Sequence, residues 1–312
     1  MSQGITHNNT LSTDALNTDF YDAMFSTINT YGGLSSLEQN TLSHVVKILN
    51  SPEQLSGHIP NLPAMLIQLL DSLKDPHTDF FTFVAIIEKD PSFAAEVLKV
   101  ANTAKYNRSN KPIVHLSKAT SLLGVTGLMK IASTLLLAEV IPCKPIHYQL
   151  YGRLIWTHSV QCGTLCELIA KSEKKNVADA YFIGLIHDLG RIIIFNCLSE
   201  DIGKSISSLT PCSREYKTLM TEMSMDMTYF IAREWQLPSV YVDALKQQRE
   251  NHRSWLGNLL YKANRLSENY ILFAKNDIKE EDYLALKDEL SITDKVFDEF
   301  NELALTIAQN ID

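Results

Sequence analysis

The segment Gly184-Leu-Ile-His-Asp-Leu-Gly190 places His187 and Asp188 side by side where an apolar run with helical spacing reaches a glycine. At a helix end both side chains can turn to one side, and imidazole and carboxylate are both ligands for divalent cations. His158 lies in an earlier helical stretch and Asn264 in a later one. The order and spacing predict that the four side chains converge on one polar cleft. The alternative for His187 and Asp188 is a hydrogen-bonded helix end without any ligand.

The composition describes an ordinary globular chain of 312 residues with 45% hydrophobic and 21% charged residues. This length fits one large domain or two closely packed ones. The net charge of -8 argues against a nucleic-acid partner, which would call for a basic face. The five cysteines show no CxxC motif, so we expect reduced thiols rather than a disulfide framework.

The chain shows no sign of a membrane partner. Its start lacks the basic and apolar regions of a secretory signal, and its most apolar stretch, Ile131 to Ile141, is too short to span a bilayer. Taken with the reduced cysteines, these features predict a cytoplasmic protein that binds neither membrane nor nucleic acid.

The spacing of apolar residues is helical almost throughout and predicts an all-α fold. No alternating run bounded by turn residues occurs, so no significant sheet is expected. Two helices have clear starts, with Asp79 as a cap and with Asp90 as a cap before Pro91. Another is opened by Leu62-Pro63 and closed by Asp75-Pro76. Further helices are predicted at 113–123, 125–140, 147–171, 177–188, 213–234, 239–250 and 254–274, with Gly124 as a break, Gly190 as a stop, a loop at Pro142 and Pro145, and two short charged helices at the end.

The first 18 residues are polar and are expected to fray. A short amphipathic helix should follow them before Gly32-Gly33, because four apolar side chains keep helical spacing there: Phe20, Met24, Ile28 and Tyr31.

The order of several short motifs resembles the HDOD family, the HD-related output domain, over roughly 55–270. The first half of the resemblance rests on Leu62-Pro63, Asp90-Pro91, Leu98-Lys-Val-Ala-Asn102 with Tyr106, Ala119 and Leu123-Gly124; the second rests on Trp156-Thr-His-Ser159, Gly184–Gly190 and Trp235-Gln-Leu-Pro238. The resemblance implies a multi-helix HD-like bundle and a signalling module of bacteria. It also implies three regions: an N-terminal extension (1–45, partly disordered with a short helix), an HDOD domain (46–274, with the HD-like core about 147–270) and a C-terminal helical extension packed on the core (275–312).

Relatives of this family include metal-dependent HD phosphohydrolases and cyclic di-GMP phosphodiesterases of the HD-GYP type. In HD hydrolases the last ligand is an aspartate, and Asn264 looks equivalent to it. A cation at His158, His187, Asp188 and Asn264 would therefore meet one negative charge instead of two. The resemblance implies a vestigial or weakly occupied site that holds no metal or a weakly bound Mn, Fe, Ni or Zn ion.

A second metal is not expected. The positions that look equivalent to further histidines of the HD-GYP relatives are Ser224, Gln248 and Arg249. A hydroxyl, an amide and a guanidinium do not replace imidazoles, and the positive charge of Arg249 would oppose a cation.

Two functions therefore remain open. The first is a regulatory module that acts by binding, with a protein partner in a signalling pathway and room for a small-molecule or nucleotide ligand. The second is a mononuclear metal-dependent phosphohydrolase that acts on a nucleotide or phosphate ester. The missing carboxylate and the absence of a glycine-rich phosphate loop favour the first.

Overall fold

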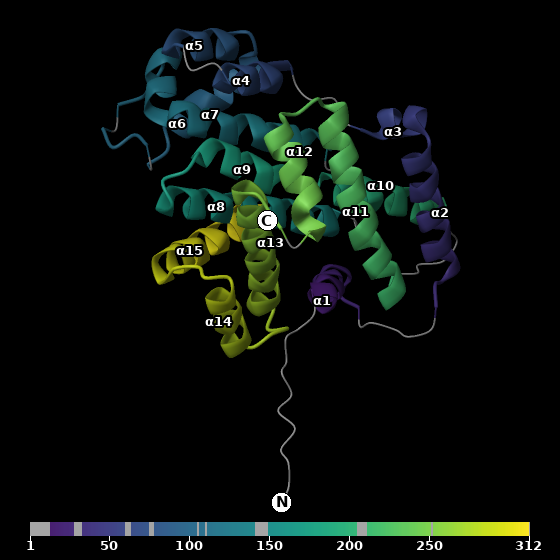
Figure 1. Cartoon of the computed structure of the whole chain (residues 1–312). Helices are drawn as coiled ribbons and strands as arrows, with labels where there is room; N and C mark the ends of the chain where they lie inside the picture. Colours follow the sequence, from purple (N-terminus) through teal and green to yellow (C-terminus); the bar gives the residue numbers. More distant parts are fainter. Residues whose placement is uncertain are drawn as a thin grey trace, which may run out of the picture.

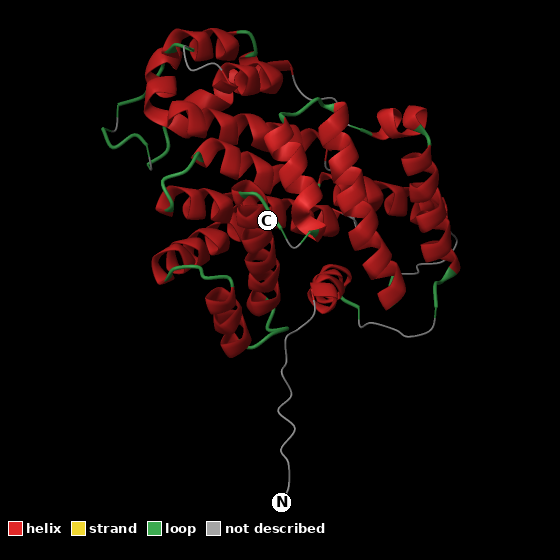
Figure 2. Cartoon of the chain, viewed as in Figure 1, coloured by secondary structure: helices red, strands yellow, loops and turns green. Residues whose placement is uncertain are grey.

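The computed structural model describes residues 13–27, 33–59, 64–74, 78–104, 106–109, 111–140, 149–204, 211–250 and 252–311. Within these ranges the regular elements are helices, and no β-strand occurs (Figure 2). The predicted all-α fold is confirmed.

The helices are labelled in Figure 1. Their bounds are α1 Thr13–Phe25, α2 Ser36–Asn50, α3 Pro52–His58, α4 Ala64–Lys74, α5 Phe80–Glu88, α6 Pro91–Ala101, α7 Leu116–Val140, α8 Gln149–Ser172, α9 Val177–Ile186, α10 Leu189–Lys204, α11 Arg214–Glu234, α12 Ser239–Lys246, the 3-10 turn η2 Gln247–Arg249, α13 Trp255–Ala274, α14 Glu280–Glu289 and α15 Asp294–Ile311.

Helix α8 lies at the centre of the packing and contacts α9, α13 and α15. Helices α4 to α7 group at one end of the molecule, while α2 packs on α10 and α11 (Figure 1). Helix α1 lies against α13, α11 and α8. The N-terminal helix is therefore part of the core, although sequence alone assigned it to an extension.

Close backbone contact fixes the crossing of α8 and α9. A Cβ atom placed on Gly184 would lie 2.7 Å from the Cα atom of Gly163 and 2.8 Å from the sulfur of Cys166. Real Cβ atoms do not approach that closely, so glycine is required there. This contact sets the distance between the helix that carries His158 and the end of the helix that leads to His187.

Several predicted helix signals are confirmed. The Asp79 carboxylate caps α5 through the Thr82 N–H, and Asp90 caps α6 through the Ser92 and Phe93 N–H groups. Gly124 has a φ of 63° and kinks α7, which was predicted as two helices.

Other expectations need correction. Helix α1 already begins at Thr13, within the segment expected to fray. Gly190 does not end a helix: its backbone packs on α11, because a Cβ there would lie 2.1 Å from the Ser224 carbonyl oxygen. Helices α2, α3 and α10 had not been predicted, and the proposed boundary at 45/46 falls inside α2. Predictions that lie outside the described residues are those for 1–12, Ile28, Tyr31, Leu62-Pro63, Asp75-Pro76, Pro142 and Pro145.

Among the described residues, the stretch that is long and apolar enough to cross a bilayer is Val177–Ile202, which spans α9 and α10. Its length and composition would allow it to cross a bilayer, but 89% of its most apolar window is buried inside the fold. Helices α9 and α10 are therefore core helices of this fold.

Candidate metal centre and pocket

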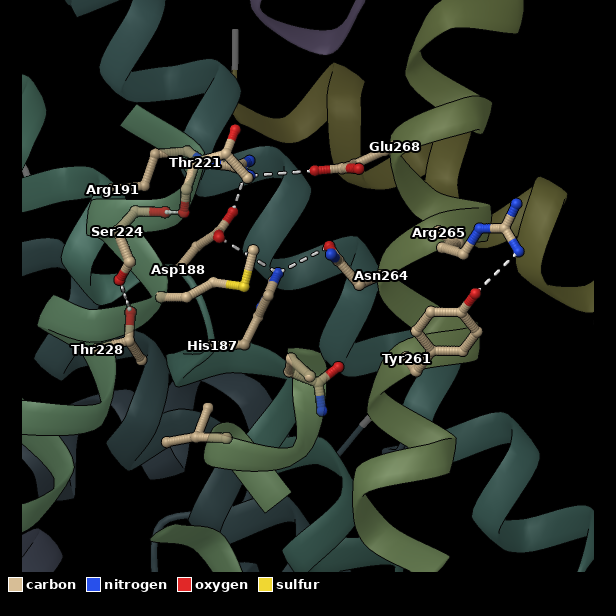
Figure 3. Close-up of a pocket in the computed structure, with 13 residues that line it drawn as sticks. His187, Asp188, Arg191, Thr221, Ser224, Thr228, Tyr261, Asn264, Arg265 and Glu268 are labelled. Atoms are coloured by element: carbon tan, nitrogen blue, oxygen red, sulfur yellow. Dashed lines mark hydrogen bonds and ion pairs between the residues drawn. The ribbon is translucent and has the colours of Figure 1, made fainter. Parts of the chain in front are cut away.

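The four residues singled out from the sequence meet at one place. His158 is in the middle of α8, His187 and Asp188 form the two-residue turn between α9 and α10, and Asn264 is on α13. Adjacent residues of a helix point in different directions, but in this turn both side chains can face the same point. Figure 3 shows His187, Asp188 and Asn264 directed toward one another.

Their polar atoms are closely and evenly spaced. The Asn264 Oδ1 atom lies 3.0 Å from Nε2 of His158 and 3.0 Å from Nε2 of His187, and the two Nε2 atoms are 3.2 Å apart. The Asp188 carboxylate oxygens lie 3.3 Å from His158 Nε2 and 3.5 Å from His187 Nε2. Both imidazoles and the carboxylate are almost fully buried.

The tautomer of His187 is fixed by the backbone. Its Nδ1 atom lies 2.6 Å from the Gly184 carbonyl oxygen, an acceptor only, so Nδ1 carries a hydrogen. In the neutral ring the Nε2 lone pair then points at His158 and Asn264. A hydrogen bond of this kind behind the ring is what orients metal-bound histidines.

This donor set fits one divalent cation in number and spacing. Ligand atoms about 2.1 Å from a shared ion lie about 3.0–3.4 Å from one another, which matches the observed distances. The same histidine pair and Asp188 form the group of potential ligands found among the described residues. The charge is less favourable than the geometry, because the set holds a single carboxylate.

The surroundings of the two histidines shift their pKa values in opposite directions. Burial would lower the pKa of His187, but the Asp188 carboxylate and the Cys162 thiol raise it to about 10. Burial lowers the pKa of His158 to about 3, against the pull of Asp188. A cation bound at Nε2 of His187 would therefore compete with a proton at that atom.

Arg191 and Glu268 extend the site on its other side. The Arg191 guanidinium pairs with Asp188 at 2.9 Å and with Glu268 at 3.1 Å, and all three side chains are buried. Burial would raise the pKa of Asp188, but Arg191 and the two histidines lower it overall. Burial raises the pKa of Glu268 despite its arginine partner. The site's carboxylate is thus ionised and already has a cationic partner.

A partly open cavity of about 70 Å³ lies next to these groups. Its wall is made by His187, Asp188, Arg191, Thr221, Ser224, Met225, Thr228, Leu245, Gln248, Tyr261, Asn264, Arg265 and Glu268. Of the further candidates from the sequence, Ser224 and Gln248 line it. Arg249 does not: it is exposed, and its guanidinium pairs with Asp226 at 3.2 Å. The positive charge beside the donor set comes from Arg191 instead.

Sequence reasoning missed several residues of the site. Two of them carried a signal. Glu268 lies four residues after Asn264 on the same face of α13, and Arg191 lies only three residues after Asp188. Phe20 and Tyr21 of α1, which cover the site from behind, carried no signal beyond their apolar character.

Comparison with known proteins identifies the family. The HDOD domain model matches residues 59–251, more than half of the chain. The chain belongs to the HDOD family. An uncharacterised protein of Treponema pallidum (strain Nichols) is 23% identical over 198 residues, which cover 60% of this chain and 37% of that protein. The chain thus spans little more than a third of that relative's length.

Three solved structures share the HDOD fold with this chain. A candidate metal-dependent phosphohydrolase from Shewanella amazonensis SB2B has a TM-score of 0.62 and 17% identity, covering 89% of this chain and 100% of its own. An HDOD domain protein of unknown function from Geobacter sulfurreducens has a TM-score of 0.60 and 16% identity, with coverages of 87% and 98%. A candidate signal transduction protein from Marinobacter aquaeolei VT8 has a TM-score of 0.54 and 17% identity, with coverages of 97% and 65%. At these identities the likeness shows the fold.

Proposed function

We propose that this HDOD protein is a bacterial signal-transduction module whose degenerate HD-type pocket acts by binding rather than by catalysis. One observation carries the proposal. The donor set contains a single carboxylate, that of Asp188, and Arg191 already holds it at 2.9 Å. Where HD hydrolases have an aspartate, the chain has the neutral Asn264, whose Oδ1 atom lies 3.0 Å from Nε2 of each histidine.

The missing charge is large on the scale of metal affinity. A unit charge pair about 4 Å apart is worth about 4 kcal/mol at an effective dielectric constant of about 20. That energy corresponds to about a thousandfold in an equilibrium constant. The positive charge of Arg191, next to Asp188, would also repel a bound cation. We therefore infer a site that binds divalent cations weakly.

A mononuclear phosphohydrolase is the second candidate, and the donor spacing of 3.0–3.5 Å favours it. A divalent cation held by His158, His187, Asp188 and Asn264 would act as a Lewis acid on a phosphoryl oxygen. The cavity of about 70 Å³ has room for several waters or one small group. It is smaller than the pockets that enclose drug-sized ligands, so a nucleotide would lie largely outside it.

The partner and the compartment belong to the same proposal. We propose a protein partner in a signalling pathway and a cytoplasmic location. The support for the partner is the similarity in fold to the candidate signal transduction protein of Marinobacter aquaeolei. The support for the compartment is the odd number of cysteines without a CxxC motif.

Metal analysis combined with an activity assay tests the proposal. Protein purified without added metal should contain well under one equivalent of Mn, Fe, Ni or Zn. It should hydrolyse cyclic di-GMP and bis(p-nitrophenyl) phosphate no faster than buffer does, with or without added Mn²⁺. The proposal is wrong if the metal is stoichiometric and supports turnover that a chelator and His187→Ala both abolish. Asn258→Ala, at an exposed position of α13 away from His187, is the control and should leave metal content and turnover unchanged.

A further inference from the structure

Helix α1 covers the back of the site with two aromatic rings. Phe20 packs on the imidazole of His158, with ring centroids 5.1 Å apart. The Arg191 guanidinium lies 4.7 Å from the centre of the Phe20 ring and 5.2 Å from that of Tyr21. Both rings are 0% exposed. A helix outside the family match at 59–251 therefore contacts a histidine and an arginine of the pocket.

Arg191 lines the pocket and also contacts the aromatic rings of α1. Its side chain is 3% exposed, and Asp188 and Glu268 balance its charge. A buried charge that loses one of its partners is strongly destabilising unless water can reach it. The faces of Phe20 and Tyr21 attract a guanidinium, but they also keep water away from it.

We propose that a ligand which takes the Asp188 carboxylate from Arg191 releases α1 from the core. A divalent cation on Asp188 repels the guanidinium and removes half of its counter-charge. Arg191 can then be solvated once Phe20 and Tyr21 leave. This inference rests on the proposed function, in which the pocket binds rather than catalyses. In this proposal, the release of α1 signals that a ligand is bound in the pocket.

Helix α1 is held to the core by the buried side chains of Phe20, Tyr21, Met24 and Phe25 and by a few polar contacts. Its polar links to the core include an ion pair from Asp22 to the buried Lys217 and a hydrogen bond from Thr27 to the Pro211 carbonyl. Gly33 follows with a φ of 78°. A free helix of 13 residues is marginal in water, so released α1 loses its amide protection. That loss can be measured.

The first experiment needs no metal. Asp188→Asn removes the counter-charge of Arg191 as a bound cation would. Hydrogen exchange of the α1 amides, Thr13–Phe25, should become about tenfold faster in this variant. Asp179→Asn is the matched control, because Asp179 is a half-buried carboxylate of α9 that accepts from Tyr241 at 2.6 Å. In the control the α1 amides should exchange as in the wild type.

The comparison within each variant separates release from general destabilisation. Amides of α9 and α15 should keep their wild-type protection in Asp188→Asn. Unchanged exchange of α1, or an equal rise in α1, α9 and α15, would overturn the inference.

The second experiment tests the reciprocal effect, because coupling between two sites is symmetric in free energy. Mn²⁺ is titrated into the full chain in the Asn264→Asp background, which supplies the second carboxylate. Phe20→Ala opens the back of the site and should tighten Mn²⁺ binding about fivefold. Phe25→Ala on the same helix, where Phe25 stacks on Tyr21 at 6.1 Å, should change it less than about twofold. Equal effects of the two variants would contradict the coupling.

Failure here is distinguishable from failure of the proposed function. Turnover that depends on a stoichiometric metal would refute the binding role and leave the α1 measurements unaffected. Unchanged α1 exchange in Asp188→Asn would refute the coupling and leave the pocket as a binding site.

Discussion

Asn264 and Arg191 stand on opposite sides of Asp188 and act on the same quantity, the negative charge that a cation would meet. Asn264 supplies an oxygen 3.0 Å from each histidine Nε2 but no charge. The guanidinium of Arg191 partly neutralises the negative charge of Asp188. The spacing of the donor atoms therefore suits a cation, while the negative charge that a cation would meet is reduced.

A second carboxylate at position 264 should raise the affinity of the site for divalent cations. Asn264→Asp should tighten Mn²⁺ binding by at least about tenfold, less than the full charge effect because water screens it and the surrounding groups are not tuned to orient the new ligand. Isothermal titration of wild type and variant measures the change. Asn258→Asp, which adds the same charge at an exposed position of α13, should leave the affinity as it is.

The pH dependence of stability is predicted at Glu38, away from the pocket. Its carboxylate accepts hydrogen bonds from the backbone N–H groups of Ser35, Cys212 and Ser213 at 2.7, 3.0 and 2.9 Å. Burial would raise the pKa of Glu38, but these bonds lower it below its usual 4.5. The folded state thus binds this proton less readily than the unfolded state. The contribution is present above about pH 4.5 and is lost as the pH falls through the lowered pKa.

Glu38→Gln should therefore cost about 1–3 kcal/mol at pH 7, and the difference from wild type should shrink as the pH falls below 4.5. Urea unfolding at pH 7 and at pH 3.5 measures both effects. Glu53→Gln, at an exposed position of α3, is the control and should show neither. A pH-independent loss in Glu38→Gln would mean that packing, and not the charge, is lost.

The convergence of the four candidate ligands could be predicted from the sequence, because the resemblance to the HDOD family indicated which positions to compare. Sequence reasoning did not find that Asp188 is held by Arg191, although the three-residue spacing allowed it. It could not find Phe20, since nothing in the local sequence says which distant helix a buried ring will cover.

Among the helices near the site, α8 and α9 approach each other closely at Gly163 and Gly184. Gly184→Ala should push them apart and cost about 1–3 kcal/mol, and the resulting shift of the turn at His187 should weaken Mn²⁺ binding in the Asn264→Asp background. Thermal unfolding and titration are the measurements.

The control for this variant is Gly57→Ala on α3, where a Cβ meets nothing within 4 Å. Replacing an open helical glycine reduces the entropy of the unfolded chain, so the control should keep or raise the melting temperature. If both variants behave alike, helix propensity and not the close approach explains the effect.

Helices with a cap and one apolar face could be predicted from the sequence, as Asp79 and Asp90 illustrate. Helix α10 was missed because its run Ile192–Phe195 is buried on all sides, and a helix that is apolar all round has no 3.6-residue pattern. Helix α2 did carry a signal. Ser35 and Glu38 form a capping box, a serine followed three residues later by glutamate, which marks a helix start.

For the whole molecule, the family match at 59–251 ends before α13 begins at Trp255. Helix α13 packs on α8, α9 and α1. Residues 59–251 alone therefore lack a helix that covers part of the hydrophobic core. A fragment of residues 59–251 should therefore retain helical circular dichroism but unfold without cooperativity and bind the dye ANS. The full chain should show one sharp transition. Cooperative unfolding of the fragment would show that α13 is an addition and not part of the fold.

The buried α9–α10 pair has a consequence for how the protein is made. Val177–Ile202 is synthesised before α11 and α13, which cover it. The end of α13 follows roughly seventy residues later, about 4–14 s at synthesis rates of about 5–20 residues per second. During that interval the nascent chain presents a long apolar segment that the targeting and chaperone machinery of a cell can recognise. The order of synthesis, and not the finished structure, therefore sets the moment at which this protein is most vulnerable to aggregation.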